Sequence, residues 1–156
     1  MCLLQAMDTI ASELDKGLII DLMNTTVPEV ADGSVEVVSV AREPGVAAKV
    51  RVKMRQLSSR SALAVCVGRG GCRVHRLRQL LNGETVVFVD ADAPMVQQIS
   101  QALRPAEICA GAICARTNGS YAILAPPETA KRLIGHRGTN IRLASRLVGC
   151  ELAVVQ

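Results

Sequence analysis

The chain has almost no aromatic residues and no tryptophan. Phe88 and Tyr121 are its only two aromatic side chains among 156 residues. Proteins that read single-stranded nucleic acid by stacking bases on rings, such as those with an RRM fold, present several exposed aromatics. A stacking platform of that kind is therefore not expected, whereas a module that clamps a phosphate backbone needs no rings.

Long apolar runs and targeting signals are also missing. No apolar run reaches the length of a membrane span, although 49% of the residues are hydrophobic. The first residues include Asp8, Glu13 and Asp15 without a basic stretch, so we expect no secretory signal peptide. The composition predicts a folded protein of one domain or two small ones, in the cytoplasm and without a membrane partner.

The cysteines do not form a metal-binding pattern. None of the six occurs in a C-x-x-C pair, and the two histidines do not flank them at zinc-finger spacing. Several lie in apolar segments such as A-V-C-V and E-I-C-A-G-A-I-C. We therefore expect reduced core residues, no metal and no cofactor. Cys72 is the exception, because it lies just after the first glycine loop, where a helix N-terminus and neighbouring arginines favour a more reactive thiol. The cysteines are Cys2, Cys66, Cys72, Cys109, Cys114 and Cys150.

Acidic residues are absent from a stretch of forty residues, 44–83, which carries nine lysines and arginines. Residues 1–43 have the opposite balance, −6, and residues 129–156 are positive again at +4. Ordinary solvated surfaces mix both signs of charge. Two separate positive blocks favour a surface that binds a polyanion and is built twice.

Each positive block contains a G-x-x-G loop that opens a basic helix. The loops read V-G-R-G-G-C-R-V at 67–74 and I-G-H-R-G-T-N-I at 134–141. Glycine lets a phosphate backbone approach closely, and the unpaired amides and dipole of the following helix favour a phosphate. A single loop could be a mere helix–helix turn. Neither copy continues into G-K-[S/T], which excludes a Walker A loop.

The elements around the two loops form an internal repeat. The order helix, strand, strand, helix, loop, helix, strand occurs twice, with the loops 67 residues apart. Val74, Leu77 and Leu80 after the first loop match Ile141, Ala144 and Leu147 after the second. We expect an α+β fold with an N-terminal cap at 1–26, a first domain at 27–90 and a second at 91–156. The expected strands are 35–40, 49–52, 85–89, 106–115, 121–124 and 151–155, and a short helix is expected at 59–66.

The cap is predicted to be an amphipathic helix from Leu3 to about Met23, with a possible break near Gly17. Its apolar positions are Leu3, Met7, Ile10, Leu14 and Leu18. Two interpretations remain open. The helix could simply cover the sheet, or this acidic segment could dock on a protein partner.

The repeated unit resembles the type II KH domain, and the tandem is similar to the paired KH domains of the NusA family of transcription factors. The matching segments run from about Val27 to the C-terminus. They are V-P-E-V-A-D-G-S-V-E-V, A-R-E-P-G, C-V-G-R-G-G-C-R-V, L-N-G-E, L-R-P-A-E and I-G-H-R-G-T-N-I-R-L-A-S-R-L-V-G. The resemblance implies single-stranded RNA binding and a role in transcription elongation, pausing, termination and antitermination.

The resemblance also implies which residues contact RNA. It implies that RNA is the main partner, that RNA polymerase or other transcription factors are further partners, and that there is no small-molecule substrate. The implied RNA-binding residues are Gly68, Arg69, Gly70, Gly71, Arg73, Gly135, His136, Arg137, Gly138, Asn140 and Arg142.

The chain departs from the bacterial pattern at several points. It does not contain the polymerase-binding and OB-fold domains that precede the KH pair in bacterial NusA. In the first loop the family usually has arginine directly before the last glycine, whereas here Arg69 comes one place earlier and Gly70 follows it. Cys150 lies where the family usually has a tryptophan. These departures leave open a module that keeps the KH fold for protein interactions. An enzyme is the least supported class, because His75 and His136 belong to different modules and neither adjoins a carboxylate.

Overall fold

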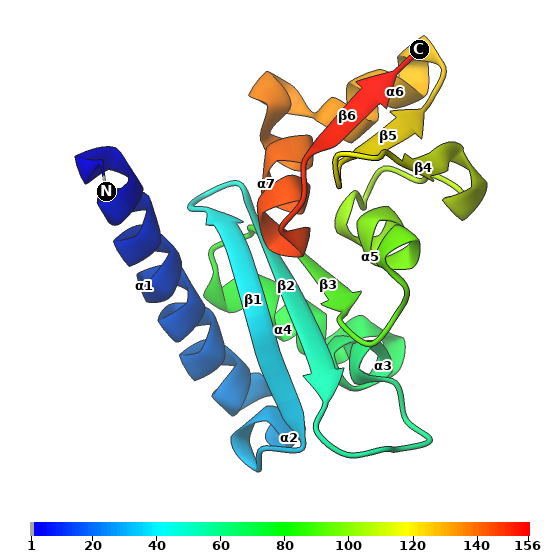
Figure 1. Cartoon of the computed structure of the whole chain (residues 1–156). Helices are drawn as coiled ribbons and strands as arrows, with labels where there is room; N and C mark the ends of the chain where they lie inside the picture. The colour runs from blue at the N-terminus through cyan, green and yellow to red at the C-terminus, as the bar shows by residue number, and fades with distance from the viewer. Residues whose placement is uncertain (1) are drawn as a thin grey trace.

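The computed structural model describes residues 2–156 and contains two three-stranded sheets with helices packed against them (Figure 1). The first half consists of α1 (Leu3–Thr26), α2 (Pro28–Ala31), β1 (Val35–Glu43), β2 (Ala47–Met54), α3 (Ala62–Val67), η1 (Arg69–Gly71), α4 (Cys72–Leu80) and β3 (Thr85–Asp90). The second consists of α5 (Met95–Ala102), η2 (Ala110–Ala112), β4 (Ile113–Ala115), β5 (Tyr121–Leu124), α6 (Pro127–Ile134), η3 (His136–Gly138), α7 (Thr139–Val148) and β6 (Leu152–Val155).

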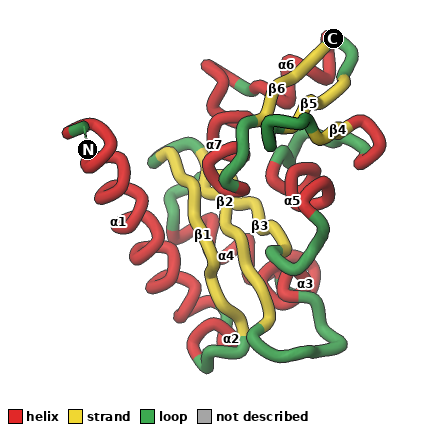
Figure 2. The backbone as a smooth tube through the Cα atoms, viewed as in Figure 1, coloured by secondary structure: helices red, strands yellow, loops and turns green. Residues whose placement is uncertain are grey.

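The two sheets have the same topology, which confirms the predicted α+β repeat. In each sheet the first two strands, β1–β2 and β4–β5, form an antiparallel hairpin. The last strand, β3 or β6, then pairs in parallel with the second strand of the hairpin. The helix–loop–helix segment supplies the crossover that a parallel pair requires. Each glycine loop therefore lies between two helices that pack beside the third strand of its own sheet (Figure 2).

Helix α1 is continuous, so the possible break near Gly17 does not occur. A glycine inside a helix costs only about 1 kcal/mol relative to alanine. The turns that follow are anchored because Ile19 and Met23 are fully buried in the core of the first domain. In contrast, Leu3, Leu4, Met7, Ile10, Leu14 and Leu18 are exposed. The apolar positions that predicted an amphipathic helix thus do not cover the sheet.

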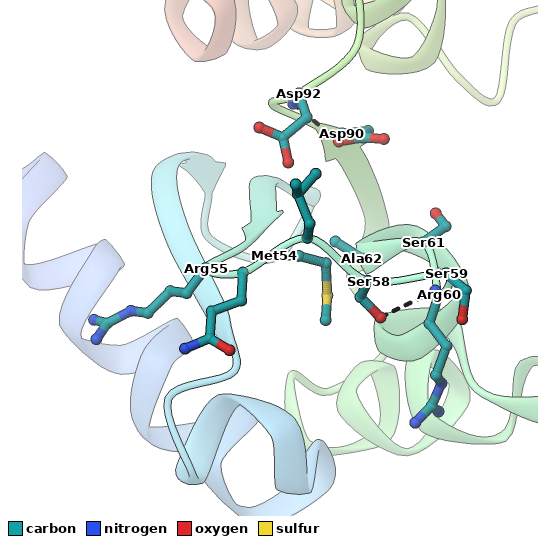
Figure 3. A pocket seen from close by; sticks show the side chains of 11 residues that line it. Met54, Arg55, Ser58, Ser59, Arg60, Ser61, Ala62, Asp90 and Asp92 are labelled. Atoms are coloured by element: carbon teal, nitrogen blue, oxygen red, sulfur yellow. Dashed lines mark hydrogen bonds between the residues drawn. The ribbon is translucent and has the colours of Figure 1, made fainter.

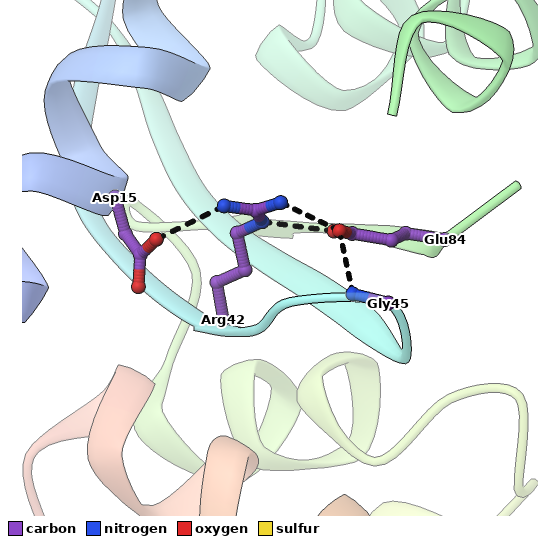
Figure 4. Close-up of polar contacts among 4 residues, drawn as sticks. All are labelled: Asp15, Arg42, Gly45 and Glu84. Atoms are coloured by element: carbon purple, nitrogen blue, oxygen red, sulfur yellow. Dashed lines mark hydrogen bonds and ion pairs between the residues drawn. The ribbon is translucent and has the colours of Figure 1, made fainter. Parts of the chain in front are cut away.

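An ion-pair network ties α1 to the sheet (Figure 4). Arg42 on β1 donates to Asp15 of α1 at 3.1 Å and to both carboxylate oxygens of Glu84, at 2.6 and 2.9 Å. Glu84 also accepts the Gly45 amide at 2.9 Å. Burial disfavours the charged form of Glu84, but the Arg42 and Gly45 hydrogen bonds outweigh it, so the pKa of Glu84 is lowered.

Two predicted elements differ in extent from those observed. The expected strand 106–115 is regular only from Ile113, because Ser100 Oγ donates to the Ile108 carbonyl at 2.8 Å and holds the earlier residues against α5. The expected helix 59–66 begins at Ala62, because the Ser61 side chain accepts the Leu63 amide at 3.2 Å and caps it there.

The expectation that the cysteines are core residues is mostly wrong. Cys66 on α3 is fully buried, and burial raises the pKa of its thiol to about 12. Cys109 instead precedes the short η2 turn, where the chain does not form the expected strand, and Cys114 lies on the solvent-facing side of β4; both are exposed. Cys2 is exposed as well, Cys150 is partly buried, and Cys72, the expected exception, is exposed; all six thiols are free.

The interface between the two domains contains both apolar contacts and hydrogen bonds. Ala41 of β1 and Val89 of β3 belong to the core cluster of the second domain. Ser39 Oγ donates to the Leu147 carbonyl at 3.1 Å. Helix α7 thereby packs on β1 and β2, so Leu147 is buried, at 2% exposure. Its counterpart Leu80 in the first domain is 37% exposed. The predicted equivalence of these two leucines holds for sequence position but not for burial.

Within residues 2–156, no helix is both long and apolar enough to cross a membrane.

Candidate nucleic-acid interface

The two glycine loops have nearly the same backbone conformation. The first glycines, Gly68 and Gly135, have φ, ψ of 78°, 166° and 77°, 176°, a region that only glycine occupies readily. The third positions are left-handed in both loops, with φ of 62° at Gly70 and 54° at Arg137. The order of arginine and glycine in the first loop therefore affects backbone strain. Gly70 adopts the left-handed conformation without strain, whereas Arg137 adopts it at a cost in conformational energy.

The first glycine of each loop lies directly on the helix that follows. A Cβ atom built on Gly68 would stand 2.9 Å from Arg73 Cβ, and one built on Gly135 would stand 2.7 Å from Asn140 Cβ. Both distances are shorter than packed carbon atoms allow. Arg73 and Asn140 occupy the same position in the repeat, so the same close approach forms both loops.

The polar atoms of Arg73 are directed into the first domain. Its guanidinium donates to Glu29 of α2 at 2.7 Å and to the Val65 carbonyl at 2.8 Å. A side chain with these partners holds α2, α3 and α4 together beneath the loop.

Asn140 makes the corresponding connection in the second domain and extends it to the first. Its amide nitrogen donates to the Leu103 and Leu133 carbonyls, and its oxygen accepts a hydrogen bond from Lys49 Nζ at 2.7 Å. Lys49 lies on β2 and is 1% exposed; its ammonium also donates to the carbonyls of Ala102 at 2.6 Å and Arg104 at 2.9 Å. Burial lowers the pKa of Lys49 to about 8.

The outer surface of each loop offers unpaired hydrogen-bond donors. Within residues 2–156, the backbone amides of Arg69, Gly70, His136 and Arg137 donate to no protein group. No side chain caps the N-terminus of α4 or of α7. The side chains of Arg69, His136 and Arg137 are exposed. The guanidinium groups of Arg69 and Arg137 therefore lie beside free loop amides just before the N-termini of α4 and α7, an arrangement that suits phosphate groups.

Arg142 links the second loop to the first domain. Its guanidinium donates to Glu43, at the end of β1, at 2.8 Å and to the Arg137 carbonyl at 3.4 Å. About half of its side chain remains exposed, at 51%. Arg142 can therefore position the loop and still present charge to a ligand.

An apolar groove adjoins the first loop. It has a volume of about 500 Å³ and lies between α3, α4 and β3. Its walls include Leu63, Val67, Val74, Val86 and Phe88. Apolar walls of this kind suit flat bases, which can pack against them without a ring platform.

A second hollow of about 320 Å³ lies between the β1–β2 turn and the second loop, bordered by Gly135, His136 and Arg137. Thr85, Arg104 and Pro105 line both hollows, so the two form one path across the domain boundary. The sequence prediction missed Arg104. The only signal was its place in the L-R-P-A-E segment, since it lies far from either loop in sequence.

The positive charge of residues 44–83 is smaller on the surface than the composition indicates. Four of its nine cations pair with acids from the first 43 residues. These pairs are Lys53 and Arg55 with Glu36, and Arg60 and Arg73 with Glu29. Arg69 and Arg76 are exposed and form no ion pair within residues 2–156. The remaining charge therefore concentrates beside the first glycine loop.

A third hollow lies away from both loops. It measures about 610 Å³ and is formed by the 55–61 segment with Asp90 and Asp92 on its opposite side (Figure 3). Arg55 and Arg60 at this site already pair with acids. Asp90 and Asp92 form no ion pair within residues 2–156, and their carboxylates repel phosphate, so we do not include this hollow in the candidate nucleic-acid interface.

The left-handed third position gives a stability prediction. Arg137→Gly should raise the free energy of unfolding by roughly 0.5–1 kcal/mol, because the relief of left-handed strain exceeds the added chain entropy of glycine. Gly70→Arg should lower it by a similar amount. Arg69→Gly is the matched control because Arg69 has no positive φ, and it should not stabilise. Urea unfolding of the three variants tests this; a stabilising Arg69→Gly would contradict the explanation.

Comparison with known proteins supports the repeat. The family model of the NusA-like first KH domain matches residues 13–91, and that of the NusA-like second KH domain matches residues 95–156. The first match includes the second half of α1, which carries the buried residues Ile19 and Met23.

Curated relatives and a solved structure agree with these matches. The transcription termination/antitermination protein NusA of Mycobacterium tuberculosis is 33% identical over 143 residues, which are 92% of this chain and 41% of the relative. The protein of the same name from Bacillus subtilis is 32% identical over 92% of this chain and 38% of the relative. The chain thus spans about two fifths of the length of these relatives.

The crystal structure of APE1850 has a TM-score of 0.50 and 16% sequence identity, and the match covers 88% of this chain and 95% of that one. At this identity it supports the fold alone. The family matches, by contrast, extend over both domains and include both glycine loops. The chain therefore belongs to the NusA-like KH domain family and contains the first and the second KH domain of that family in tandem.

Proposed function

We propose that the chain binds single-stranded RNA with both glycine loops at once and acts in transcription elongation, termination and antitermination. The observation that carries the proposal is the shared geometry of the loops. Both present free amides and exposed cations, and one path lined by Thr85, Arg104 and Pro105 connects them. The names of the relatives support the role in transcription.

In this proposal the phosphates bind at the amides of Arg69 and Gly70 in one loop and of His136 and Arg137 in the other. Bases enter the apolar groove, at roughly four nucleotides per domain. Arg104 contacts the strand where it passes between the domains. Arg73 and Asn140 support the loops from beneath, since their polar atoms already have protein partners.

Binding to RNA polymerase or to another transcription factor stays a prediction from the family resemblance. The RNA proposal does not depend on it, because every contact named above lies on the loops and the path between them.

The proposal predicts a large loss of RNA affinity when either loop becomes acidic. Arg69→Asp with Gly70→Asp, and His136→Asp with Arg137→Asp, should each weaken binding of a short single-stranded RNA at least tenfold, because an added carboxylate repels phosphate and removes a cation. Fluorescence anisotropy at several salt concentrations measures the effect, and circular dichroism checks the fold.

The matched control is Arg116→Asp with Thr117→Asp in the exposed β4–β5 turn, which changes the net charge as much as the first loop variant does. It should retain most of the wild-type affinity. The slope of log affinity against log salt should also become shallower in the loop variants, by roughly 0.7 for each phosphate that the variant no longer binds. If all variants bind alike, the loops do not recognise RNA.

A further inference from the structure

Helix α1 carries a second apolar face that the first domain does not use. Ile19 and Met23 face inward and are fully buried. On the opposite side, Leu3, Met7 and Leu14 are 79%, 63% and 70% exposed, and Leu4, Ile10 and Leu18 accompany them. Contiguous exposed side chains of this size mark an interaction surface on a soluble protein. We call these six residues the outer stripe.

The spacing of the outer stripe matches the seam of a helix pair. Leu3, Met7, Ile10 and Leu14 are separated by four, three and four residues, the alternation of a and d positions in a coiled coil. The exposed Asp21 ends the stripe one turn after Leu18. The stripe is therefore about 24 Å long and contains no charged residue.

The stripe is also self-complementary. If two α1 helices run antiparallel, Leu3 of one lies opposite Leu18 of the other, Met7 lies opposite Leu14, and the two Ile10 side chains meet near the twofold axis. Such isologous contacts are the commonest arrangement in soluble dimers.

The acids near the stripe are compatible with this pairing. Asp8 and Glu13 lie beyond opposite edges of the stripe, about 220° apart when measured across it. In an antiparallel pair each edge meets the same edge of the partner, so Asp8 does not face the Glu13 of the other copy. Asp15 is bound to Arg42 of its own domain.

We propose that the outer stripe is the interface of a twofold homodimer formed by two antiparallel α1 helices. A standard protein interface uses roughly 20–30 residues from each partner. The stripe supplies fewer, so a dissociation constant on the order of micromolar is expected. The dimer places two RNA-binding tandems in one particle.

Sedimentation equilibrium of the full chain from about 1 to 200 μM tests the proposal. Wild type should change from monomer to dimer over this range. Ile10→Gln with Leu14→Gln should stay monomeric with an unchanged circular dichroism spectrum, since both residues are exposed. Leu57→Gln with Leu80→Gln is the matched control, because these exposed leucines lie outside the stripe, and it should dimerise like wild type.

The direction of pairing has its own test. Leu3→Lys alone and Leu18→Glu alone should each be monomeric, whereas their mixture should recover a dimer because the new charges meet across an antiparallel seam. A parallel pair would not bring these positions together. A wild-type chain that remains monomeric at 200 μM overturns the proposal and assigns the stripe to a different protein partner. A mixture that stays monomeric overturns the antiparallel arrangement.

Discussion

Gly135→Ala should lower the free energy of unfolding by roughly 2–4 kcal/mol. Alanine at φ of 77° and ψ of 176° enters a region that costs about 1–3 kcal/mol for a residue with a side chain. The new Cβ would also stand 2.7 Å from Asn140 Cβ and 3.0 Å from the Asn140 amide nitrogen. Because that nitrogen belongs to the first turn of α7, the overlap cannot be relieved by a side-chain rotation. The reduced entropy of the unfolded chain returns only about 0.4–1 kcal/mol.

The matched control is Gly119→Ala. Gly119 has a similar φ of 82°, but no atom lies within 4 Å of the place of its Cβ. It should cost only about 1 kcal/mol, since it has conformational strain without overlap. Equal losses in the two variants, measured by urea unfolding, would mean that the contact with Asn140 is not what requires glycine at position 135.

Lys49→Met should lower the free energy of unfolding by roughly 3 kcal/mol at pH 7. The lysine donates to two carbonyls and to Asn140, and each hydrogen bond from a charged donor is worth about 1.5–3 kcal/mol. Against this, the fall of its pKa from 10.5 to about 8 corresponds to a burial cost of about 3 kcal/mol. The hydrogen-bond contribution exceeds the burial cost, because methionine leaves the three acceptors of Lys49 without a donor.

The pH dependence provides an independent measurement at the same residue. Between about pH 8 and 10.5 the folded lysine is neutral while the unfolded lysine keeps its proton, so the unfolded state binds more protons. Stability contributed by this site therefore rises with pH across that window, by up to about 1.4 kcal/mol per pH unit. Lys49→Met should lack this rise, and Lys53→Met, at a half-exposed lysine on the same strand, should retain it. Parallel pH profiles for wild type and Lys49→Met would contradict a lowered pKa.

The local parts of the fold were predictable from sequence because their causes are local. Gly68 and Gly135 recur with the same neighbours, and the valine-rich segments around Pro44-Gly45 mark the first hairpin. Both glycine loops consequently lie between two helices, as predicted.

Which side chains are buried or paired could not be predicted, because this depends on tertiary contacts that sequence patterns do not reveal. Periodicity identifies an apolar face on α1 but not whether the sheet lies against it, and Ile19 and Met23 on the other face pack instead. Likewise, the charge of Lys49 and Arg73 counts as surface charge in a composition, although one is buried against carbonyls and the other pairs with Glu29. Leu80 and Leu147 differ because only α7 has a second sheet to pack on.

The contacts between the two domains also have a mechanical consequence. Lys49, Ser39 and Arg142 join β1 and β2 to α5 and α7 at separate points, beside the covalent link at residues 91–94. If a nucleic-acid strand bound to both loops is pulled, the tension between the domains is then shared among these hydrogen bonds and the covalent link. Under such tension the two domains should stay together, and the bound nucleic-acid strand should detach from a loop before the domains separate.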